Sequence, residues 1–173
     1  EQYSIDECFL DMSGTGRLYL DPLAIAATIK DEIRDTLGFT VNIGIASNKL
    51  MAKIANETGK KSARGADYPR ALCIVQPGRE AEFLAPLPVS RLWGVGQKTE
   101  AALAALGIHT IGELACWPEA DLVQRFGKAG SELARHACGI DERPMVTEYE
   151  IKSISQETTF TRDVRSDEKL EAL

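Results

Sequence analysis

Three patterns are missing from the sequence, and each absence excludes a class of protein. No apolar run approaches the roughly 20 residues of a membrane-spanning helix, and no signal peptide opens the chain, so we expect no membrane partner. The four cysteines lie far apart and form no Cys-x-x-Cys pair, at Cys8, Cys73, Cys116 and Cys138. This spacing indicates neither a zinc site nor a disulfide framework, and it favours a cytoplasmic location.

Nucleophile and nucleotide-loop motifs are missing as well. His109 and His136 are isolated, and no Ser/His/Asp or Cys/His arrangement can be assembled around them. Residues 59–62 are not a phosphate loop, because no glycine stands five residues before Gly59. Residues 94–96 are not a dinucleotide fingerprint, because no strand precedes them.

The net charge of −6 conceals a change of sign along the chain. Residues 1–35 carry eight acidic and three basic side chains, whereas residues 47–70 carry six basic and two acidic ones. An acidic segment followed by a basic one suits a metal ion beside a polyanion, and a solvated basic helix face would have the same composition.

Two adjacent carboxylates, Asp6 and Glu7, interrupt an apolar stretch near the start of the chain. An ionised carboxylate beside a core needs a compensating charge, which a divalent cation supplies. Neighbouring residues on a regular strand point to opposite faces, so this pair can converge on one ion only at a bend. We therefore predict a hairpin with the pair at its tip, between residues 2–5 and 8–12. A solvated acidic turn is the alternative to a magnesium site.

The following segment predicts one amphipathic helix and one strand. Asp21 caps the helix, Pro22 opens it, apolar residues recur at every fourth position, and Gly38 ends it. Residues 39–45 then alternate between apolar and polar, as half-buried strands do.

A second helix and a third strand complete the first part of the chain. Ser47 can cap this helix, whose inward face is predicted to hold Leu50, Met51 and Ile54. A polar loop at 59–69 precedes a strand at 71–75. The order of strand, helix, strand, helix and strand predicts an α+β fold in which helices pack on an open sheet.

Strand patterns end after residue 78, and short helices follow. Residues 80–84 form one, Thr110 and Glu113 form a capping box that opens another, and Pro118 opens the next. We count four or five helices before Gly139, which predicts a second, small, all-helical domain.

Two glycine-bearing turns in this helical part are candidates for nucleic-acid binding. A turn of this kind leaves the first amides of the next helix open, and glycine lets a phosphate approach them. Such helix-hairpin-helix units hold the DNA backbone without reading bases, although a plain helix connection would use glycine in the same way. The predicted backbone-binding residues are Gly94, Gly96, Lys98, Gly127, Lys128 and Gly130.

Taken together, these segments resemble the Y-family translesion DNA polymerases, most closely the DNA polymerase IV type. The matching stretches are residues 3–11, 44–55, 87–96 and 152–155. The resemblance implies a partial polymerase palm at 1–78, a helical thumb at 79–143, a linker at 144–152 and the start of a little finger domain at 153–173. It also implies DNA-templated nucleotidyl transfer in translesion synthesis and DNA repair.

The resemblance assigns roles to three residues of the first domain. Asp6 matches a metal-binding aspartate, Glu7 matches the catalytic glutamate beside the primer terminus, and Lys60 matches the lysine that meets the incoming triphosphate, with Lys61 as the neighbouring register. Two Mg²⁺ ions would support attack of the primer 3′-hydroxyl on the α-phosphate. The implied partners are primer-template DNA, deoxynucleoside triphosphates and a sliding clamp, and we expect a monomer.

The family pattern also has parts that these 173 residues lack. Its first metal aspartate and its fingers domain would precede Glu1, so we expect this piece alone not to extend primers. One alternative is a non-catalytic homologue that keeps the hairpins as a DNA-binding module. Another is a palm-type nucleotide cyclase, which has no need of paired hairpins.

Overall fold

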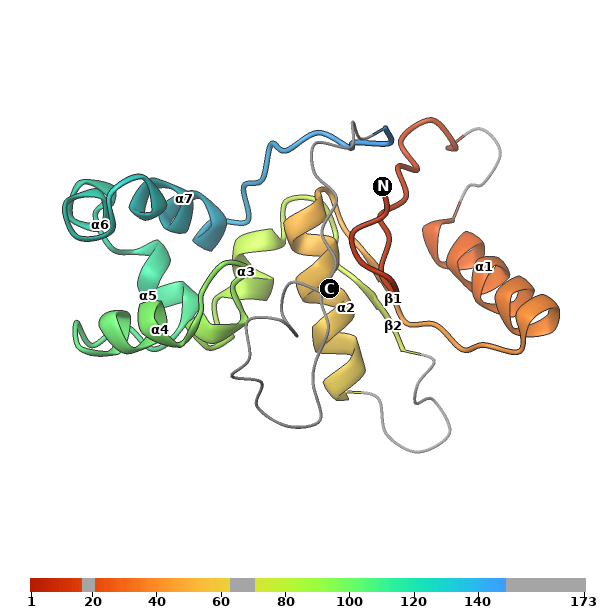
Figure 1. Cartoon of the computed structure of the whole chain (residues 1–173), viewed down its shortest axis with the longest axis horizontal. Coiled ribbons are helices and arrows are strands. Elements are labelled where there is room, and N and C mark those ends of the chain that lie inside the picture. The colour runs from red at the N-terminus through yellow and green to blue at the C-terminus, as the bar shows by residue number, and fades with distance from the viewer. Residues whose placement is uncertain (17–20, 63–70, 149–173) are drawn as a thin grey trace, which may run out of the picture.

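The structure is a computed structural model that describes residues 1–16, 21–62 and 71–148. Figure 1 shows α2 at the centre, lying over a small sheet, with α1 at one end of the molecule and the helices of the second half at the other. The elements of the first half are α1 (Pro22–Leu37), β1 (Ile43–Ile45), α2 (Lys49–Ser62) and β2 (Leu72–Ile74).

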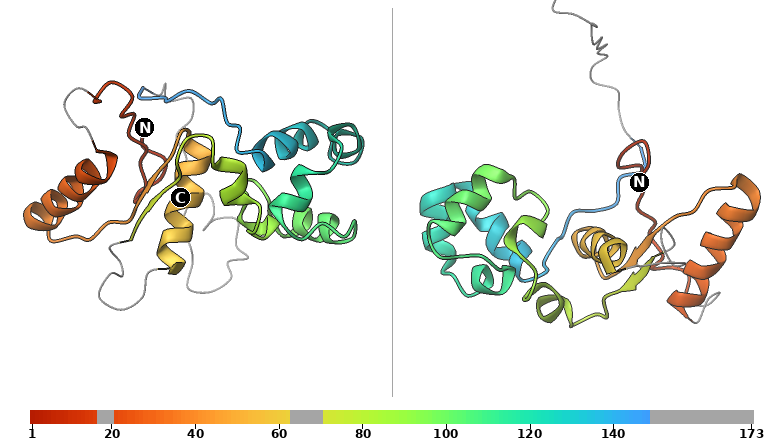
Figure 2. Two further views of the ribbon diagram at one scale, coloured as in Figure 1. Left: turned by 180° about the vertical axis from the view of Figure 1, so that it is seen from behind. Right: turned by 90° about the horizontal axis from the view of Figure 1, so that it is seen from below.

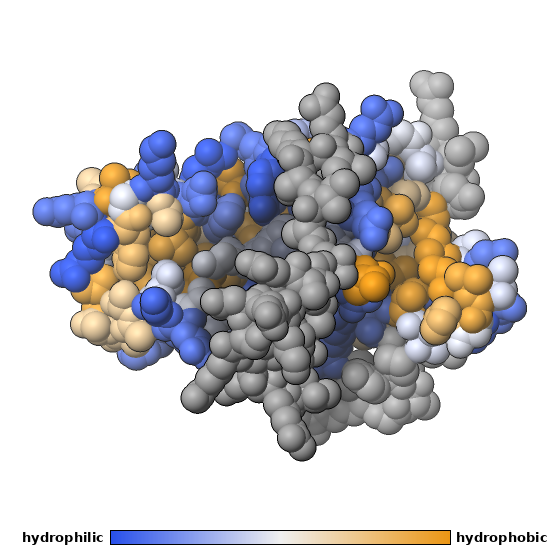
Figure 3. Space-filling view, in the orientation of Figure 1, coloured by the Kyte–Doolittle hydropathy of each residue, from blue (hydrophilic) through white to orange (hydrophobic). Residues whose placement is uncertain are grey.

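Helix α1 has the bounds that its sequence predicts. The carboxylate of Asp21 accepts a hydrogen bond from the Leu23 amide at 2.9 Å, and Gly38 ends the helix in the left-handed conformation at φ 72°. Its apolar stripe is only partly covered, since Leu37 at the end of the helix is 62% exposed, and Phe39 just beyond the helix is 67% exposed. Figure 3 shows hydrophobic side chains gathered at the end of the molecule where α1 lies.

Strands β1 and β2 form a parallel pair in which Ile43 lies opposite Leu72. The predicted strand at 39–45 is too long, because β1 begins only at Ile43. The side chain of Asn42 accepts a hydrogen bond from the Ala71 amide at 2.8 Å and so takes the place of the next backbone rung. The second predicted strand, at 71–75, is confirmed over Leu72–Ile74.

Helix α2 packs directly on β1 through Gly44. A Cβ atom at Gly44 would lie 2.1 Å from the carbonyl oxygen of Ala52, so only glycine permits this helix to approach so closely. The predicted inward residues Leu50, Met51 and Ile54 are at most 3% exposed.

Both ends of α2 differ from the prediction. The side chain of Asn48, not Ser47, accepts the hydrogen bond from the Met51 amide, at 2.9 Å. Ser47 instead donates to the carboxylate of Glu80 at 2.7 Å. The helix continues to Ser62, through the first residues of the predicted loop at 59–69.

The N-terminal segment makes a tight turn with a single antiparallel bridge, between Gln2 and Cys8. The amides of Tyr3 and Ser4 both donate to the carbonyl oxygen of Glu7, at 2.9 and 3.1 Å. These bonds use the amides within the turn, which explains why a bridge forms where two strands of a hairpin were predicted.

The second half is helical, as predicted, and lies on the far side of α2 from α1 in both views of Figure 2. It contains α3 (Glu80–Leu84), a short 3₁₀ helix (Val89–Arg91), α4 (Gln97–Ala104), α5 (Ile111–Ala115), α6 (Glu119–Phe126) and α7 (Lys128–Ala137). The capping box of Thr110 and Glu113 is present at the start of α5. None of the helices in the described ranges is both long and apolar enough to span a membrane.

One hydrophobic core joins the two halves, running from Leu50 and Ile54 in α2 to Leu133 in α7. The segment after α7 returns to the first half, where the side chain of Asp141 accepts a hydrogen bond from the Leu50 amide at 3.0 Å. Burial raises the pKa of Asp141, but its hydrogen bonds from Arg143 and the Leu50 amide outweigh burial and hold that pKa at about 2. The predicted domain boundaries stay predictions, and the proposed little finger segment at 153–173 lies outside the described residues.

Candidate active site and nucleic-acid interface

The predicted acidic pair lies at the N-terminal turn, beside the basic face of α2. Asp6 is exposed at the bend, where its carboxylate accepts a hydrogen bond from the Ser4 hydroxyl at 2.6 Å. This bond, with smaller contributions from Lys60 and Lys53, lowers the pKa of Asp6. Asp6 therefore presents an ionised carboxylate to solvent at neutral pH.

Glu7 points toward α2, where its carboxylate accepts a hydrogen bond from the Lys53 ammonium at 2.7 Å. The two side chains are 28% and 22% exposed, so the ion pair is partly shielded from water. The Lys53 nitrogen also lies 4.6 Å from the centre of the Tyr3 ring and 5.6 Å from that of Trp93. The pattern of the sequence did not single out Lys53, which stands one helical turn after Lys49.

Lys60 lies on the same helix, nearly two turns after Lys53. Its ammonium donates to the carboxylate of Glu57 at 2.7 Å. That bond raises the pKa of Lys60, and the charges of Glu7 and Asp6 add smaller contributions in the same direction. The charge of Lys60 therefore interacts with the two carboxylates of the acidic turn. The side chain of Lys61, the next residue, is exposed to solvent.

Asp6 and Glu7 are suited to only a part of a metal site. Carboxylate oxygens are the hard ligands that Mg²⁺ prefers, and Asp6 is ionised and open to solvent. Glu7 is already paired with Lys53. Within the described ranges, no three acidic, histidine or cysteine side chains come together in a group that could hold a metal ion.

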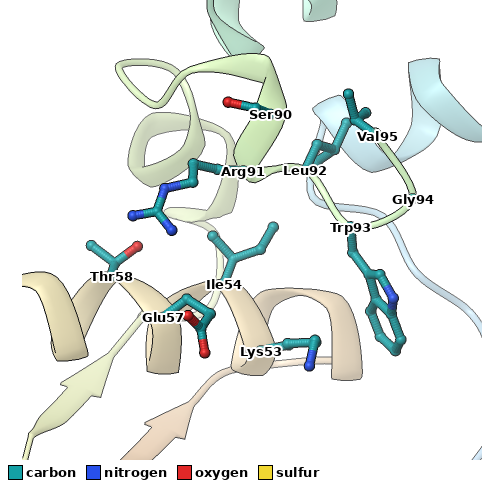
Figure 4. A pocket seen from close by; sticks show the side chains of 10 residues that line it. All are labelled: Lys53, Ile54, Glu57, Thr58, Ser90, Arg91, Leu92, Trp93, Gly94 and Val95. Carbon is teal, nitrogen blue, oxygen red and sulfur yellow. The ribbon is translucent and has the colours of Figure 1, made fainter. Parts of the chain in front are cut away.

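A pocket of about 270 Å³ separates α2 from the turn that leads into α4. Figure 4 shows Lys53, Glu57 and Thr58 on the helix side, with Arg91 and Trp93 facing them. Arg91 is partly buried and makes no ion pair within the described part of the chain. It is a second basic residue that the sequence patterns did not single out.

The two glycine turns have the backbone geometry expected of them. Gly94 has φ 96° and Gly127 has φ 61°, conformations that favour glycine. Helices α4 and α7 begin directly after Gly96 and Gly127. A glycine has no side chain, so neither residue can cap the first backbone amides of the helix that follows it. These helix starts are therefore open to an external acceptor.

The six predicted backbone-binding residues do not share one environment. Lys98 and Lys128 are exposed in the first turns of α4 and α7. Gly130 is buried, and its amide donates to the carbonyl oxygen of Gly127 at 2.9 Å. A Cβ atom there would lie 2.2 Å from the carbonyl oxygen of Leu122, so Gly130 lets α6 and α7 pack closely.

Comparisons with known proteins agree with this arrangement. Residues 1–57 match the impB/mucB/samB family, and residues 77–108 match the IMS family HHH motif. The chain is 41% identical over 172 residues to DNA polymerase IV of Dehalococcoides mccartyi, covering 99% of the chain and 42% of that protein. It is 40% identical over 173 residues to DNA polymerase IV of Stenotrophomonas maltophilia, covering 100% of the chain and 45% of that protein.

Solved structures give the same relationship. DinB from Sulfolobus solfataricus matches with a TM-score of 0.65 and 26% identity, over 78% of this chain and 38% of that one. An insertion ternary complex of Dbh DNA polymerase matches with a TM-score of 0.64 and 25% identity, over 77% and 37%. The chain spans less than half the length of these relatives. These matches, together with a fold that resembles the palm and thumb of such polymerases, show that the chain belongs to the Y-family of DNA polymerases. DNA polymerase IV proteins are among its relatives.

Proposed function

We propose that the full-length protein is a DNA-directed DNA polymerase that carries out translesion synthesis in DNA repair, in the cytoplasm. One observation carries the proposal: Glu7 of the acidic turn pairs with Lys53 of α2, and Lys53 lines a pocket whose other side leads into the glycine turn at 94–96. The primer terminus and triphosphate would lie at the acidic turn, and the glycine turns would hold the DNA backbone.

The roles of the side chains follow from their charge and position. Asp6 and Glu7 would contribute to holding Mg²⁺, which in such enzymes activates the attacking hydroxyl and stabilises charge on the phosphates. Lys60 would bind the triphosphate, since a lysine ammonium is charged at neutral pH and the charges of Glu7 and Asp6 act on Lys60. The open amides of α4 and α7, with Lys98 and Lys128, would contact successive phosphates of the duplex.

Primer extension tests the proposal directly. The full-length protein should add nucleotides to a primer in a template-directed manner, with Mg²⁺ required and EDTA inhibitory. The 173-residue chain alone should not, because the described acids provide two adjacent carboxylates and no third ligand. Templated addition by the short chain would refute the second expectation, and its absence in the full-length protein would refute the first.

Lys60 and its neighbour Lys61 form a matched pair of variants. Lys60→Ala in the full-length protein should raise KM for the incoming nucleotide about tenfold, because a charge-assisted contact to the triphosphate is lost. Lys61→Ala removes an exposed charge one residue away and should change KM less than about twofold. Steady-state incorporation of a single nucleotide measures both. Equal effects of the two variants would contradict the assignment of Lys60.

A non-catalytic DNA-binding module is the second candidate function. The pairing of Glu7 with Lys53 favours it, because a glutamate held in an ion pair has less freedom to serve a metal ion. Such a module would bind DNA through the glycine turns and would be indifferent to the charge of Asp6. Asp6→Asn in the full-length protein therefore distinguishes the polymerase from the non-catalytic DNA-binding module.

A further inference from the structure

The indole of Trp93 contacts two segments that are distant from it in the sequence. The Tyr3 ring meets it edge-on, with centroids 5.1 Å apart, and the Phe9 ring stacks at 6.1 Å. The guanidinium of Arg143 lies 4.2 Å from its centre. Trp93 therefore joins the acidic turn to the helical half and to the segment that follows α7.

Lys53 connects this aromatic cluster to Glu7. Its ammonium lies over the Tyr3 ring and within 5.6 Å of the centre of the Trp93 ring, and it donates to the Glu7 carboxylate at 2.7 Å. A lysine side chain has many rotamers, and the faces of two aromatic rings restrict an ammonium to a small region. The position of the Glu7 carboxylate consequently depends on both rings.

Trp93 also stands directly before Gly94, at the turn that precedes α4. Contact of DNA with the 94–96 turn would act on the backbone that carries the indole. Figure 4 shows the Trp93 side chain reaching from the turn toward the end of α2 where Lys53 lies, with Gly94 next to Trp93 in the turn.

We propose that Trp93 is a positioning residue that holds Lys53, and through it Glu7, so that seating of the 94–96 turn on DNA sets the orientation of the catalytic carboxylate. This inference rests on the proposed polymerase function. It assigns to the 94–96 turn a second task besides holding the DNA backbone, namely organising the acidic turn through Lys53 on the opposite wall of the pocket.

Single-nucleotide incorporation by the full-length protein tests the inference. Trp93→Ala should lower kcat about tenfold, because misplacing a reacting group by about 1 Å can lower a rate about a hundredfold and a smaller displacement lowers it less. The Kd for primer-template DNA should change less than about twofold. Trp93→Phe, which keeps a ring face for Lys53, should restore most of kcat. Lys53→Met should lower kcat as Trp93→Ala does, and the double variant should be no worse than Lys53→Met alone.

Hydrogen exchange and a second tryptophan provide the controls. Trp93→Ala should speed amide exchange at Tyr3 and Ser4, whose N–H groups donate to the Glu7 carbonyl, in the absence of DNA and nucleotide. Trp117→Phe alters a tryptophan packed against the helical core and should leave kcat and this exchange unchanged.

The outcomes separate the inference from the function on which it rests. A wild-type protein without templated synthesis overturns the proposed function itself. An active wild-type protein in which Trp93→Ala weakens only DNA binding, or in which the Trp93 and Lys53 effects multiply, overturns the positioning role alone.

Discussion

Asp6→Asn in the full-length protein should lower the rate of templated nucleotide incorporation by about a hundredfold to a thousandfold. The substitution preserves the size of the side chain and its ability to accept the Ser4 hydrogen bond, and removes the negative charge. A neutral amide is a much weaker ligand for Mg²⁺ than a carboxylate, so the loss should appear in kcat at saturating nucleotide. Rapid-quench measurement of one turnover gives the rate.

Asp11→Asn is the matched control for this experiment. Asp11 is exposed, and hydrogen bonds from the Ser13 side chain and amide lower the pKa of its carboxyl group. Asp6 and Asp11 thus carry similar charges in one short segment. The Asp11 variant should keep its rate within about threefold of the wild type, since effects of exposed charges are small. If Asp6→Asn behaved like Asp11→Asn, the metal assignment would fail and the DNA-binding module would become the better account.

Gly44→Ala should destabilise the protein by about 3 kcal/mol, the upper part of the range for overpacked cores. The added Cβ would lie 2.1 Å from the Ala52 carbonyl oxygen and 2.5 Å from the Asn56 amide nitrogen, both of them backbone atoms of α2. Backbone atoms cannot rotate away, so the whole helix must move off β1. Urea denaturation followed by circular dichroism measures the change.

The same substitution should also impair catalysis, because α2 carries Lys53 and Lys60 toward the acidic turn. Gly14→Ala provides the control: no heavy atom lies within 4 Å of its added Cβ, and the stability and rate should stay near the wild-type values. A Gly44 variant as stable as the Gly14 variant would contradict the close packing of α2 on the sheet.

The sequence predicted best what short-range interactions determine. The bounds of α1 follow from Asp21 and Gly38, and the start of α5 follows from Thr110 and Glu113, because capping involves residues at most four positions apart. The inward face of α2 follows from helical periodicity.

Tertiary contacts explain what the sequence could not predict. Ser47 and Asn48 are both good caps, and the choice falls on Asn48 because Glu80, 33 residues away, engages Ser47. The length of β1 depends on its pairing with β2. The importance of Lys53 depends on Trp93, which lies 40 positions further along the chain.

At the N-terminal bend, too, the sequence predicted the local structure but not the tertiary contacts of Asp6 and Glu7. A turn at Asp6 could be anticipated because two carboxylates cannot both face one ion from a straight strand. The direction of each side chain could not, because Glu7 is oriented by the ammonium of Lys53 on a separate element. The burial of Gly130 likewise depends on the neighbouring helix, since a glycine at a turn and a glycine at a helix crossing look alike in sequence.

The contact between Glu1 and Val146 has a consequence for biosynthesis. The Val146 amide donates to the Glu1 carboxylate at 2.9 Å, and Lys49 pairs with the same carboxylate at 2.8 Å. A ribosome that adds 5–20 residues per second needs on the order of ten seconds to pass from one partner to the other. During that interval the nascent acidic turn lacks its last tether, so its final arrangement is reached only after the helical half has emerged.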